Sequence, residues 1–256
     1  RTIFQPVNVG MWQNCKVLLN ALNGEYFAFV EGDDYWTDPN KLQIQMDFME
    51  SHPDYVCCFH NAAVIRDGGT QNELSFSRYP EKPVKETTGL PDLLMDGNYV
   101  PTSGLMMRNV FKGNYPKEIA DRKVMCDTMS HFLHASKGKY HYINKDMSVY
   151  RLHPGGVTEG LSNLKKLESM VYMIGLSDNF TGQQYHTIHQ QALQKWYYWL
   201  LNSSIALGDK ARVKKYLRLI EQNREFDSQY HPNFVRKVWV EQFVPGGKAL
   251  LKLLGK

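Results

Sequence analysis

The sequence predicts an α/β domain at the amino-terminal end of the chain and a helical region after it, on three observations. The stretch "NCKVLLNALNGEYFAFVEGDD" has apolar residues at helical spacing, then a break at Asn23-Gly24, then a short apolar run over residues 26–30. Acidic residues follow this run directly, at the position where ligands bind in open α/β sheets. After residue 160 the apolar spacing is mainly helical. We therefore expect an α/β domain over residues 1–160 and a helical region over residues 161–256.

The 256-residue chain has the composition of a soluble globular protein, with 43% hydrophobic and 22% charged residues. Its formal net charge of +4 is too small to indicate a nucleic-acid partner. No apolar run reaches the roughly 18 residues that a membrane-spanning helix needs. The four cysteines (Cys15, Cys57, Cys58 and Cys126) form no CxxC pair, so we expect free thiols in a reducing compartment. Together these features predict a cytoplasmic protein.

Further elements of the α/β domain are predicted from local signals. Pro39 near a helix start and the spacing of Leu42, Met46 and Met49 predict a helix that ends at His52. The other expected elements, in chain order, are a strand over 55–65, a loop over 66–89, a short helix over 90–97, a loop entering a strand over 100–109, a helix over 127–138 and two short strands within 140–156. Together they describe a sheet with helices between its strands.

The last segment of the chain, residues 234–256, carries five basic residues and one acid, so the rest of the chain is neutral. It also holds six large apolar side chains: Trp239, Phe243, Leu250, Leu251, Leu253 and Leu254. Two interpretations remain open. In the first, these apolar residues lie in an anionic membrane surface with the lysines at the headgroups. In the second, the segment packs against the body of the protein or a second subunit, as in a homodimer.

Glu31, Asp33 and Asp34 lie within four residues at the end of the first predicted strand. Carboxylate oxygens are preferred ligands of Mg²⁺ and similar cations, often together with substrate phosphates. Glu31 and Asp33 are two residues apart, which in extended backbone places both side chains on one side. An isolated acidic triplet is more often a solvated turn, with Asp34 as a cap. The position after an apolar strand favours a metal and diphosphate site instead.

The segment "NALNGEYFAFVEGDDYWTDPNKLQIQMDFMESHPDYVCCFHNA" resembles the central part of family 2 glycosyltransferases, which have the GT-A fold. The resemblance implies a Rossmann-like mixed sheet flanked by helices. It also implies that "EGDD" is a variant of the family's DxD motif, which binds a nucleotide-sugar through Mn²⁺ or Mg²⁺. Glu31, Asp33 and Asp34 would then bind the donor, with the cation at Asp33 and Glu31.

Three later segments continue the resemblance. "PTSGLMMRN" matches a Gly-containing segment near the sugar, which assigns Gly104 to donor binding. "MCDTMSHFLHASKG" matches the segment that holds the general base; Asp127 would be that base, and Cys126 stands where the family often has an acid. "VYRLHPGGVT" matches a carboxy-terminal His segment, so His153 would complete the metal site or contact the diphosphate, and Arg151 would contact the diphosphate or brace the loop.

Some neighbouring residues have two interpretations. Trp36 packs beside the donor or acceptor, or it belongs to the core. His60 and Asn61 approach the site, or, as we favour, they satisfy the end of a strand. Cys126 has no His at a recognisable spacing, so we do not expect a thiolate nucleophile.

The front of the family domain has no counterpart in this sequence. Family members open with a strand such as "VSVIIPTYN" and a "DDGSTD" strand end that hold the nucleobase and ribose, whereas this chain starts at "RTIFQPVNVGMWQN". The resemblance covers residues 1–160. We therefore expect an N-terminally truncated GT-A domain that lacks its first strands and much of its nucleotide pocket.

The resemblance predicts a metal-dependent, inverting glycosyltransferase. It would move a sugar from a nucleoside diphosphate donor, expected to be a UDP-sugar, to a hydroxyl of a saccharide or lipid-linked acceptor, and bacterial members of this type commonly build surface polysaccharide. A non-catalytic binding or assembly module is the alternative, favoured by the missing front and by Cys126. A metal-dependent phosphotransferase shares the carboxylate chemistry but would need a Gly-rich phosphate loop, which the sequence lacks.

Overall fold

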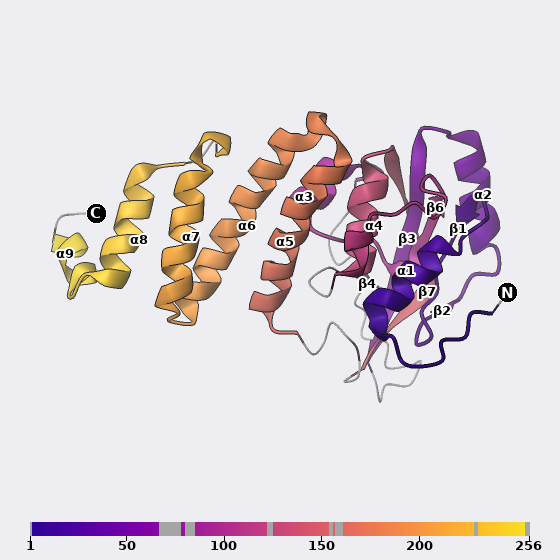
Figure 1. The fold of residues 1–256 in the computed structure, drawn as a ribbon, viewed down its shortest axis with the longest axis horizontal. Coiled ribbons are helices and arrows are strands. Elements are labelled where there is room, and N and C mark those ends of the chain that lie inside the picture. The colour runs from indigo at the N-terminus through magenta and orange to yellow at the C-terminus, as the bar shows by residue number, and fades with distance from the viewer. Residues whose placement is uncertain are drawn as a thin grey trace. The chain divides into compact units, whose positions relative to one another are not determined.

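The computed structural model describes residues 2–66, 78–79, 85–121, 125–153, 156, 161–227 and 230–253 (Figure 1). The chain folds as two compact units. Unit 1 comprises Arg1–Leu161 with Asn179–Gly182, and unit 2 comprises Ser162–Asp178 with Gln183–Lys256. Strands and helices mix in unit 1, and the described part of unit 2 is helical. The protein is therefore a mixed α/β protein with a curled mixed sheet flanked by helices.

Unit 1 is built on a sheet of seven described strands, whose main order is β1-β6-β3-β7-β2. Its two long central strands, β3 and β7, run parallel, and every other described pairing is antiparallel. The strands are β1 (Tyr26–Phe27), β2 (Tyr35–Trp36), β3 (Tyr55–Arg66), β4 (Arg78–Tyr79), β5 (Thr87–Thr88), β6 (Leu105–Arg108) and β7 (Lys139–Leu152). The fully buried aromatic and sulfur-containing side chains of β3 explain its central place.

The helices of unit 1 present apolar faces to this sheet and to one another. They are α1 (Gly10–Asn20), α2 (Lys41–Ser51), α3 (Leu90–Asp96) and α4 (Cys126–Ala135), with short 3-10 turns η2 (Thr102–Gly104) and η3 (Lys117–Ala120). Helix α4 is buried along most of its length, and Met129, Phe132 and Leu133 have at most 1% exposure. Both α2 and α4 contact β3, and α1 contacts α4. The expected helices of this unit are confirmed.

Two strand predictions are wrong. The expected buried strand over residues 26–30 is only two residues long, because β1 is the edge strand of the sheet path and pairs with β6 alone. Val30, beyond its end, is 48% exposed. The two short strands expected within 140–156 are one strand, β7, which contains an irregularity: His60 pairs with Ile143, whereas Asn61 pairs with Asp146. The intervening polar residues are a bulge in a continuous strand rather than a turn.

Unit 2 consists of α5 (Asn163–Thr181, whose last three residues belong to unit 1), α6 (His186–Ala206), α7 (Lys210–Gln222), α8 (Pro232–Phe243) and α9 (Gly247–Leu253), with short turns η4 (Gln183–Tyr185) and η5 (Arg224–Phe226). One apolar cluster joins α6, α7 and α8, and its buried members are Leu200, Leu201, Val213, Tyr216, Leu217, Ile220 and Val238. The Asp209 side chain caps α7 by accepting the backbone N–H of Arg212 at 3.0 Å. The helices expected after residue 160 are confirmed.

The final helices use part of their apolar surface for packing inside unit 2. Val238 and Leu251 are buried, and Phe243 packs on the apolar cluster of this unit. Trp239 is 49% exposed and leaves a free aromatic surface on α8. Leu254 lies outside the described residues. Across the described ranges, no helix has both the length and the apolar character needed to cross a membrane.

Candidate functional site

The acidic segment that follows β1 meets the end of β7. A tight turn forms where the Asp34 N–H donates to the Glu31 carbonyl at 3.1 Å. Asp33 Oδ2 lies 2.9 Å from His153 Nε2, and Asp34 Oδ1 accepts the backbone N–H of Arg151 at 3.1 Å. Two segments about 120 residues apart in the chain are thus joined by side chains that the sequence had assigned to one site.

Asp127 lies in the first turn of α4 and belongs to the same acidic group. Its carboxylate accepts the Asn98 amide at 3.2 Å and the Thr128 hydroxyl at 3.4 Å. Burial raises the pKa of Asp127 above its ordinary value. Asp127 is also close enough to Glu31 for its charge to act on that residue. The expected base and the expected metal-binding acids therefore share one electrostatic environment.

Burial raises the pKa of Glu31, Asp34 and Asp127 at this site. Desolvation, followed by repulsion from Asp127, Asp34 and Asp33, raises the pKa of Glu31 to about 7. Since Glu31 remains open to solvent on one side, water screens part of this effect. Burial also raises the pKa of Asp34, against the opposing hydrogen bonds from the Arg151 backbone and the Ser103 hydroxyl. Raised carboxyl pKa values in one place are typical of functional sites.

Gly104 lies at the end of turn η2, in the tightest part of the site. A Cβ at this position would lie 2.7 Å from the His60 carbonyl oxygen and 3.3 Å from Pro101. Only glycine therefore fits without a shift of the turn. The preceding residue, Ser103, is fully buried and contacts both Asp34 and the Ser148 hydroxyl, the latter at 3.2 Å. Gly104 thus acts by letting η2 approach the acidic segment.

A buried polar group beneath η2 holds this turn in place. Trp36 Nε1 donates to the Ser103 carbonyl at 2.9 Å, and Lys41 Nζ lies 4.4 Å from the centre of the Trp36 ring. Lys41 donates to Gln45 Oε1 at 2.7 Å, and Gln45 Nε2 donates to the Gly104 carbonyl at 2.9 Å. Lys41 is only 1% exposed, and burial lowers its pKa to about 8.

Sequence reasoning missed Lys41 and Gln45. The signal that could have found them is a polar pair four residues apart on α2, on the same face as the buried Met49. His60 and Asn61 are both buried in β3, and His60 Nδ1 donates to the Asn61 carbonyl at 2.7 Å. Burial lowers the pKa of His60 to about 4, so this residue is a neutral structural histidine at pH 7.

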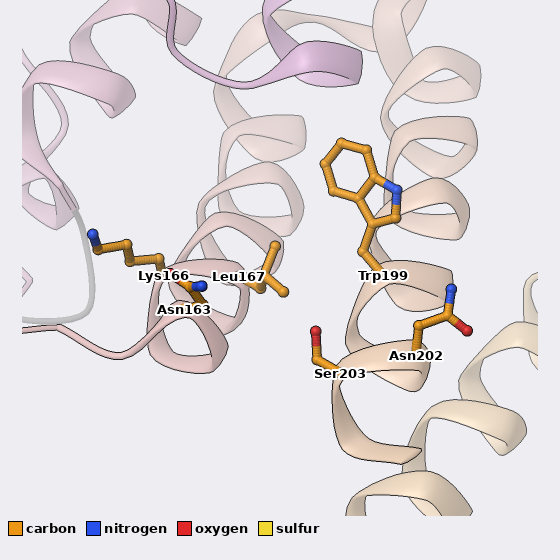
Figure 2. A pocket seen from close by; sticks show the side chains of 6 residues that line it. All are labelled: Asn163, Lys166, Leu167, Trp199, Asn202 and Ser203. Atoms are coloured by element: carbon orange, nitrogen blue, oxygen red, sulfur yellow. The ribbon is translucent and has the colours of Figure 1, made fainter. Parts of the chain in front are cut away.

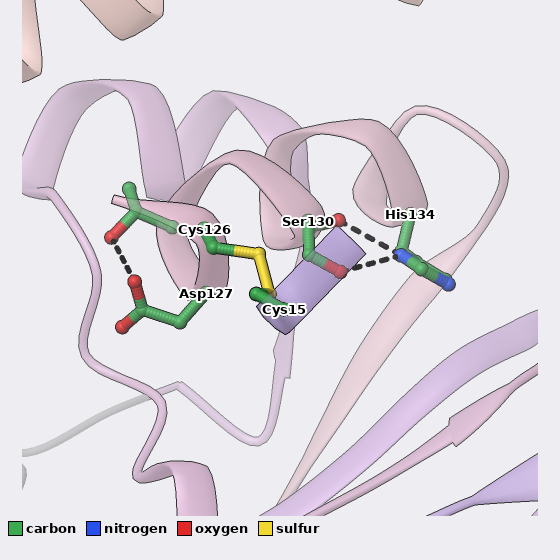
Figure 3. The surroundings of a disulfide bond; sticks show 6 residues. Cys15, Cys126, Asp127, Ser130 and His134 are labelled. Atoms are coloured by element: carbon green, nitrogen blue, oxygen red, sulfur yellow. Dashed lines mark hydrogen bonds between the residues drawn. A yellow bond between two sulfur atoms is a disulfide. The ribbon is translucent and has the colours of Figure 1, made fainter. Parts of the chain in front are cut away.

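The expectation of four free thiols is wrong for two of them. Cys15 on α1 and Cys126 on α4 form a disulfide (Figure 3), whereas Cys57 and Cys58 are free and buried. The pairing joins positions 111 residues apart, with their Cα atoms 6.6 Å apart, so no local spacing could reveal it. Because Cys126 precedes Asp127 directly, the disulfide fastens the start of α4, where the candidate base lies.

Asp33 and His153 are the residues best placed to hold a cation. Mg²⁺ is often bound by one or two carboxylates together with substrate phosphates, so Asp33 can serve as a ligand without a complete cage of protein ligands. Among the residues that the structure describes, no three His, Cys, Asp or Glu side chains are grouped so as to hold a metal ion by themselves. A cation at this site would thus depend on the bound substrate for most of its ligands.

Comparison with known proteins gives relatives without a stated activity. No family model matches the chain. It is 33% identical over 157 residues to uncharacterized proteins of Mycobacterium bovis and of two strains of Mycobacterium tuberculosis. The match covers 61% of this chain and 43% of each relative. The chain therefore matches less than half the length of these relatives.

Proposed function

We propose that unit 1 transfers a sugar from a nucleoside diphosphate donor, a UDP-sugar by our expectation, to a hydroxyl of a saccharide or lipid-linked acceptor. The observation that supports this proposal best is the contact of Asp33 with His153, beside Asp34 and near Glu31, on whose charge Asp127 acts. It brings the acids of two distant segments to one place on the sheet. The resemblance to family 2 glycosyltransferases supplies the reaction.

The residues present fit a divalent cation that bridges protein and diphosphate. Asp33 and His153 would hold Mn²⁺ or Mg²⁺, with Glu31 beside them, and the cation would neutralise the charge that grows on the leaving diphosphate. The Arg151 guanidinium is close enough to act on the charge of Asp34, so it can help to balance the charge of this site. Gly104 would let the donor sugar approach the backbone of η2.

Asp127 would act as the general base. An acceptor hydroxyl gives its proton to the Asp127 carboxylate while its oxygen attacks the anomeric carbon, and the bond from that carbon to the diphosphate oxygen breaks. Asn98 and Thr128 orient the carboxylate for this transfer. Because the raised pKa of Asp127 makes it a better proton acceptor while it remains ionised, the environment suits the role. A single displacement of this kind inverts the anomeric centre.

The second candidate is a non-catalytic binding or assembly module. Asp33 and His153 can form an ion pair with each other, which is also what a purely structural cluster would do. In that case the acids would stabilise the junction of β7 with the acidic segment and would bind no nucleotide. The two candidates differ in one measurable property, which is metal-dependent nucleotide binding.

Thermal melting with UDP, GDP and dTDP, each with and without Mn²⁺, tests the proposal. We expect one nucleotide with Mn²⁺ to raise the melting temperature, since a ligand that binds only the native state stabilises it. Asp33→Ala should remove this effect, whereas Asp47→Ala, which changes an exposed acid on α2, should retain it. Asp127→Asn should keep nucleotide binding and lose transfer. Absence of a shift with every nucleotide would favour the binding module.

We also propose that residues 234–256 touch anionic membrane from the cytoplasmic side. Trp239, Arg236 and Lys237 of α8 and Lys248 and Lys252 of α9 are exposed and could meet lipid headgroups. Truncation would remove core residues such as Val238, so charge reversal of the four basic residues is the better test. Flotation with vesicles that contain phosphatidylserine should be lost in this variant. Unchanged flotation of the charge-reversal variant would contradict the proposed membrane contact.

A further inference from the structure

A hollow of about 540 Å³ lies between α5 and α6 in unit 2 (Figure 2). Helix α5 contributes Asn163, Lys166 and Leu167, and helix α6 contributes Trp199, Asn202 and Ser203. All six residues belong to unit 2 and lie apart from the acidic site of unit 1 in the chain. The hollow is open to solvent over much of its extent. The hollow shares no residue with the acidic site.

Trp199 provides an aromatic surface in this hollow. Its side chain is 39% exposed, although large apolar side chains are usually buried in a helix stack. Trp196 packs against it edge to face, with ring centres 4.6 Å apart, and Lys195 Nζ lies 5.1 Å from the centre of its ring. These contacts restrict the indole, so a ligand that stacks on it needs to order little of the protein.

Three polar side chains line the same hollow as Trp199. Within the ranges that the structure describes, the side chains of Asn163, Asn202 and Ser203 have no hydrogen-bond partner. An amide offers both donors and an acceptor, and a hydroxyl offers one of each. In Figure 2 the ammonium end of Lys166 points away from Trp199, so Lys195 is the cation that lies beside the indole.

We propose that this hollow binds a neutral saccharide, with one sugar ring stacked on Trp199. A sugar ring has an apolar C–H face, which suits an exposed indole, and a rim of hydroxyls, which suits free amides and a serine hydroxyl. A phosphate-rich ligand would require several cations at the indole, where Lys195 is the lysine in contact with the ring. A lipid chain would leave Asn163, Asn202 and Ser203 desolvated without partners. A saccharide matches this lining because its apolar face suits the indole and its hydroxyls suit the amide and serine side chains.

The saccharide inference requires only unit 2. The further step, that the bound chain is the glycan that accepts the transferred sugar, rests on the proposed function of unit 1. A glycosyltransferase that extends a polymer gains from a second hold on it, because two linked contacts raise the effective concentration of the chain. Unit 2 can bind a saccharide even if unit 1 transfers no sugar, and the reverse also holds. The variants below distinguish these outcomes.

Saturation-transfer NMR and calorimetry on the full chain with cellohexaose, maltohexaose, chitohexaose and a mannohexaose test the binding claim. We expect at least one of them to bind with a Kd in the millimolar range or tighter. Trp199→Ala should weaken this binding about tenfold or more, as loss of a stacked aromatic contact predicts. Trp239→Ala is the matched control, since this 49% exposed indole lies on α8, outside the hollow.

Asn202→Ala and Asn163→Ala serve if Trp199→Ala disturbs the fold, because both side chains are exposed. Each should weaken binding without a change in melting temperature. Asp33→Ala should leave saccharide binding intact while it removes the metal-dependent nucleotide effect. Absence of binding to all four hexasaccharides, or binding that Trp199→Ala and both Asn variants leave unchanged, overturns the inference and leaves the function of unit 1 untouched.

Discussion

Three acids of the candidate site in unit 1 and two acids of unit 2 differ in the direction of their pKa shifts. Burial raises the pKa of Asp34 and Asp127 in unit 1, and desolvation together with acidic neighbours raises that of Glu31 to about 7. In unit 2, hydrogen bonds from the Arg212 backbone and guanidinium lower the pKa of Asp209. At Glu168, burial tends to raise the pKa, but hydrogen bonds from Arg212 and Tyr216 outweigh burial and lower the pKa.

These two groups of acids differ in whether their ionised forms stabilise the folded protein. In unit 2, Arg212 Nη1 lies 2.6 Å from Asp209 and its Nε lies 3.1 Å from Glu168, so each carboxylate has a cation and contributes to stability. In unit 1, burial disfavours the charged forms of Glu31, Asp34 and Asp127, and acidic neighbours add to this effect at Glu31 and Asp34, which lowers stability at neutral pH. Carboxylates that are kept where their charged forms are disfavoured are typical of functional sites. The predictions below test this separation.

Leu200→Ala should have the largest effect. Leu200 has 0% exposure in the apolar cluster of unit 2, so its truncation should lower the free energy of unfolding of this unit by about 2–5 kcal/mol. Urea denaturation followed by circular dichroism measures the loss. Leu207→Ala is the control, since Leu207 is 67% exposed just after α6 and should change stability by no more than about 0.5 kcal/mol.

The same variant tests whether the units depend on one another. If the site of unit 1 is self-contained, the Leu200→Ala protein should keep its Mn²⁺-dependent nucleotide effect at temperatures below its first transition. If Leu200→Ala removed the nucleotide effect as well as the stability of unit 2, the helical unit would support the acidic site. The two units would then unfold as one cooperative structure.

A glycine-to-alanine change should have opposite signs in the two units. Gly104→Ala places a Cβ 2.7 Å from the His60 carbonyl, so η2 must shift, at a cost of about 1–3 kcal/mol and with weaker nucleotide binding. Gly175 lies exposed inside α5 with nothing within 4 Å of an added Cβ. Gly175→Ala should therefore stabilise unit 2 by about 0.5–1 kcal/mol. Thermal melting of both variants measures the difference, and equal signs would contradict it.

Much of the helical structure could be predicted, because helix signals are local. The break at Asn23-Gly24, shortly after α1 ends at Asn20, and the apolar spacing after residue 160 are signals that depend on residues a few positions apart. Strands were harder, since their place depends on partners far along the chain. Nothing within residues 26–30 reveals that β1 is an edge, and nothing within β7 shows that its polar middle is a bulge.

The site was predicted only in part, for the same reason. The resemblance selected Asp33 and His153, which the structure brings to 2.9 Å from each other. It could not select Lys41, because a lysine on a helix is expected at the surface and this one is 1% exposed. The disulfide of Cys15 and Cys126 follows from the packing of α1 on α4, which no spacing encodes.

Trp36→Phe should have a smaller effect than the glycine change. Phenylalanine keeps the ring beside Lys41 but removes the hydrogen bond to the Ser103 carbonyl, which should lower stability by about 1 kcal/mol and loosen η2. Trp239→Phe alters a 49% exposed indole of unit 2 and should change neither property. Denaturant melting and nucleotide titration of the two variants measure this. A silent Trp36→Phe would mean that η2 is held by Gln45 alone.

The smallest expected effect is a change in pH dependence at Glu31. Its pKa is about 7 in the folded protein and about 4.5 without the fold, so between these values the native state binds more protons than the unfolded state. Stability should therefore fall as pH rises from about 5 to 8. Because Glu31 is partly solvated, the slope should be a fraction of the roughly 1.4 kcal/mol per pH unit that one fully linked proton gives.

Glu31→Gln should remove this slope and raise stability at pH 8, whereas Glu25→Gln, at an exposed acid that precedes β1, should keep it. Glu168→Gln in unit 2 should act in the opposite direction. The lowered pKa of Glu168 means that its stabilising effect is present above about pH 4.5 and is lost as the pH falls below that, so the variant should lose stability at pH 7. Urea denaturation at a series of pH values measures all three. If Glu31→Gln lowered stability at pH 8 as Glu168→Gln does at pH 7, the acids of unit 1 would be structural after all, and the case for a site there would rest on nucleotide binding alone.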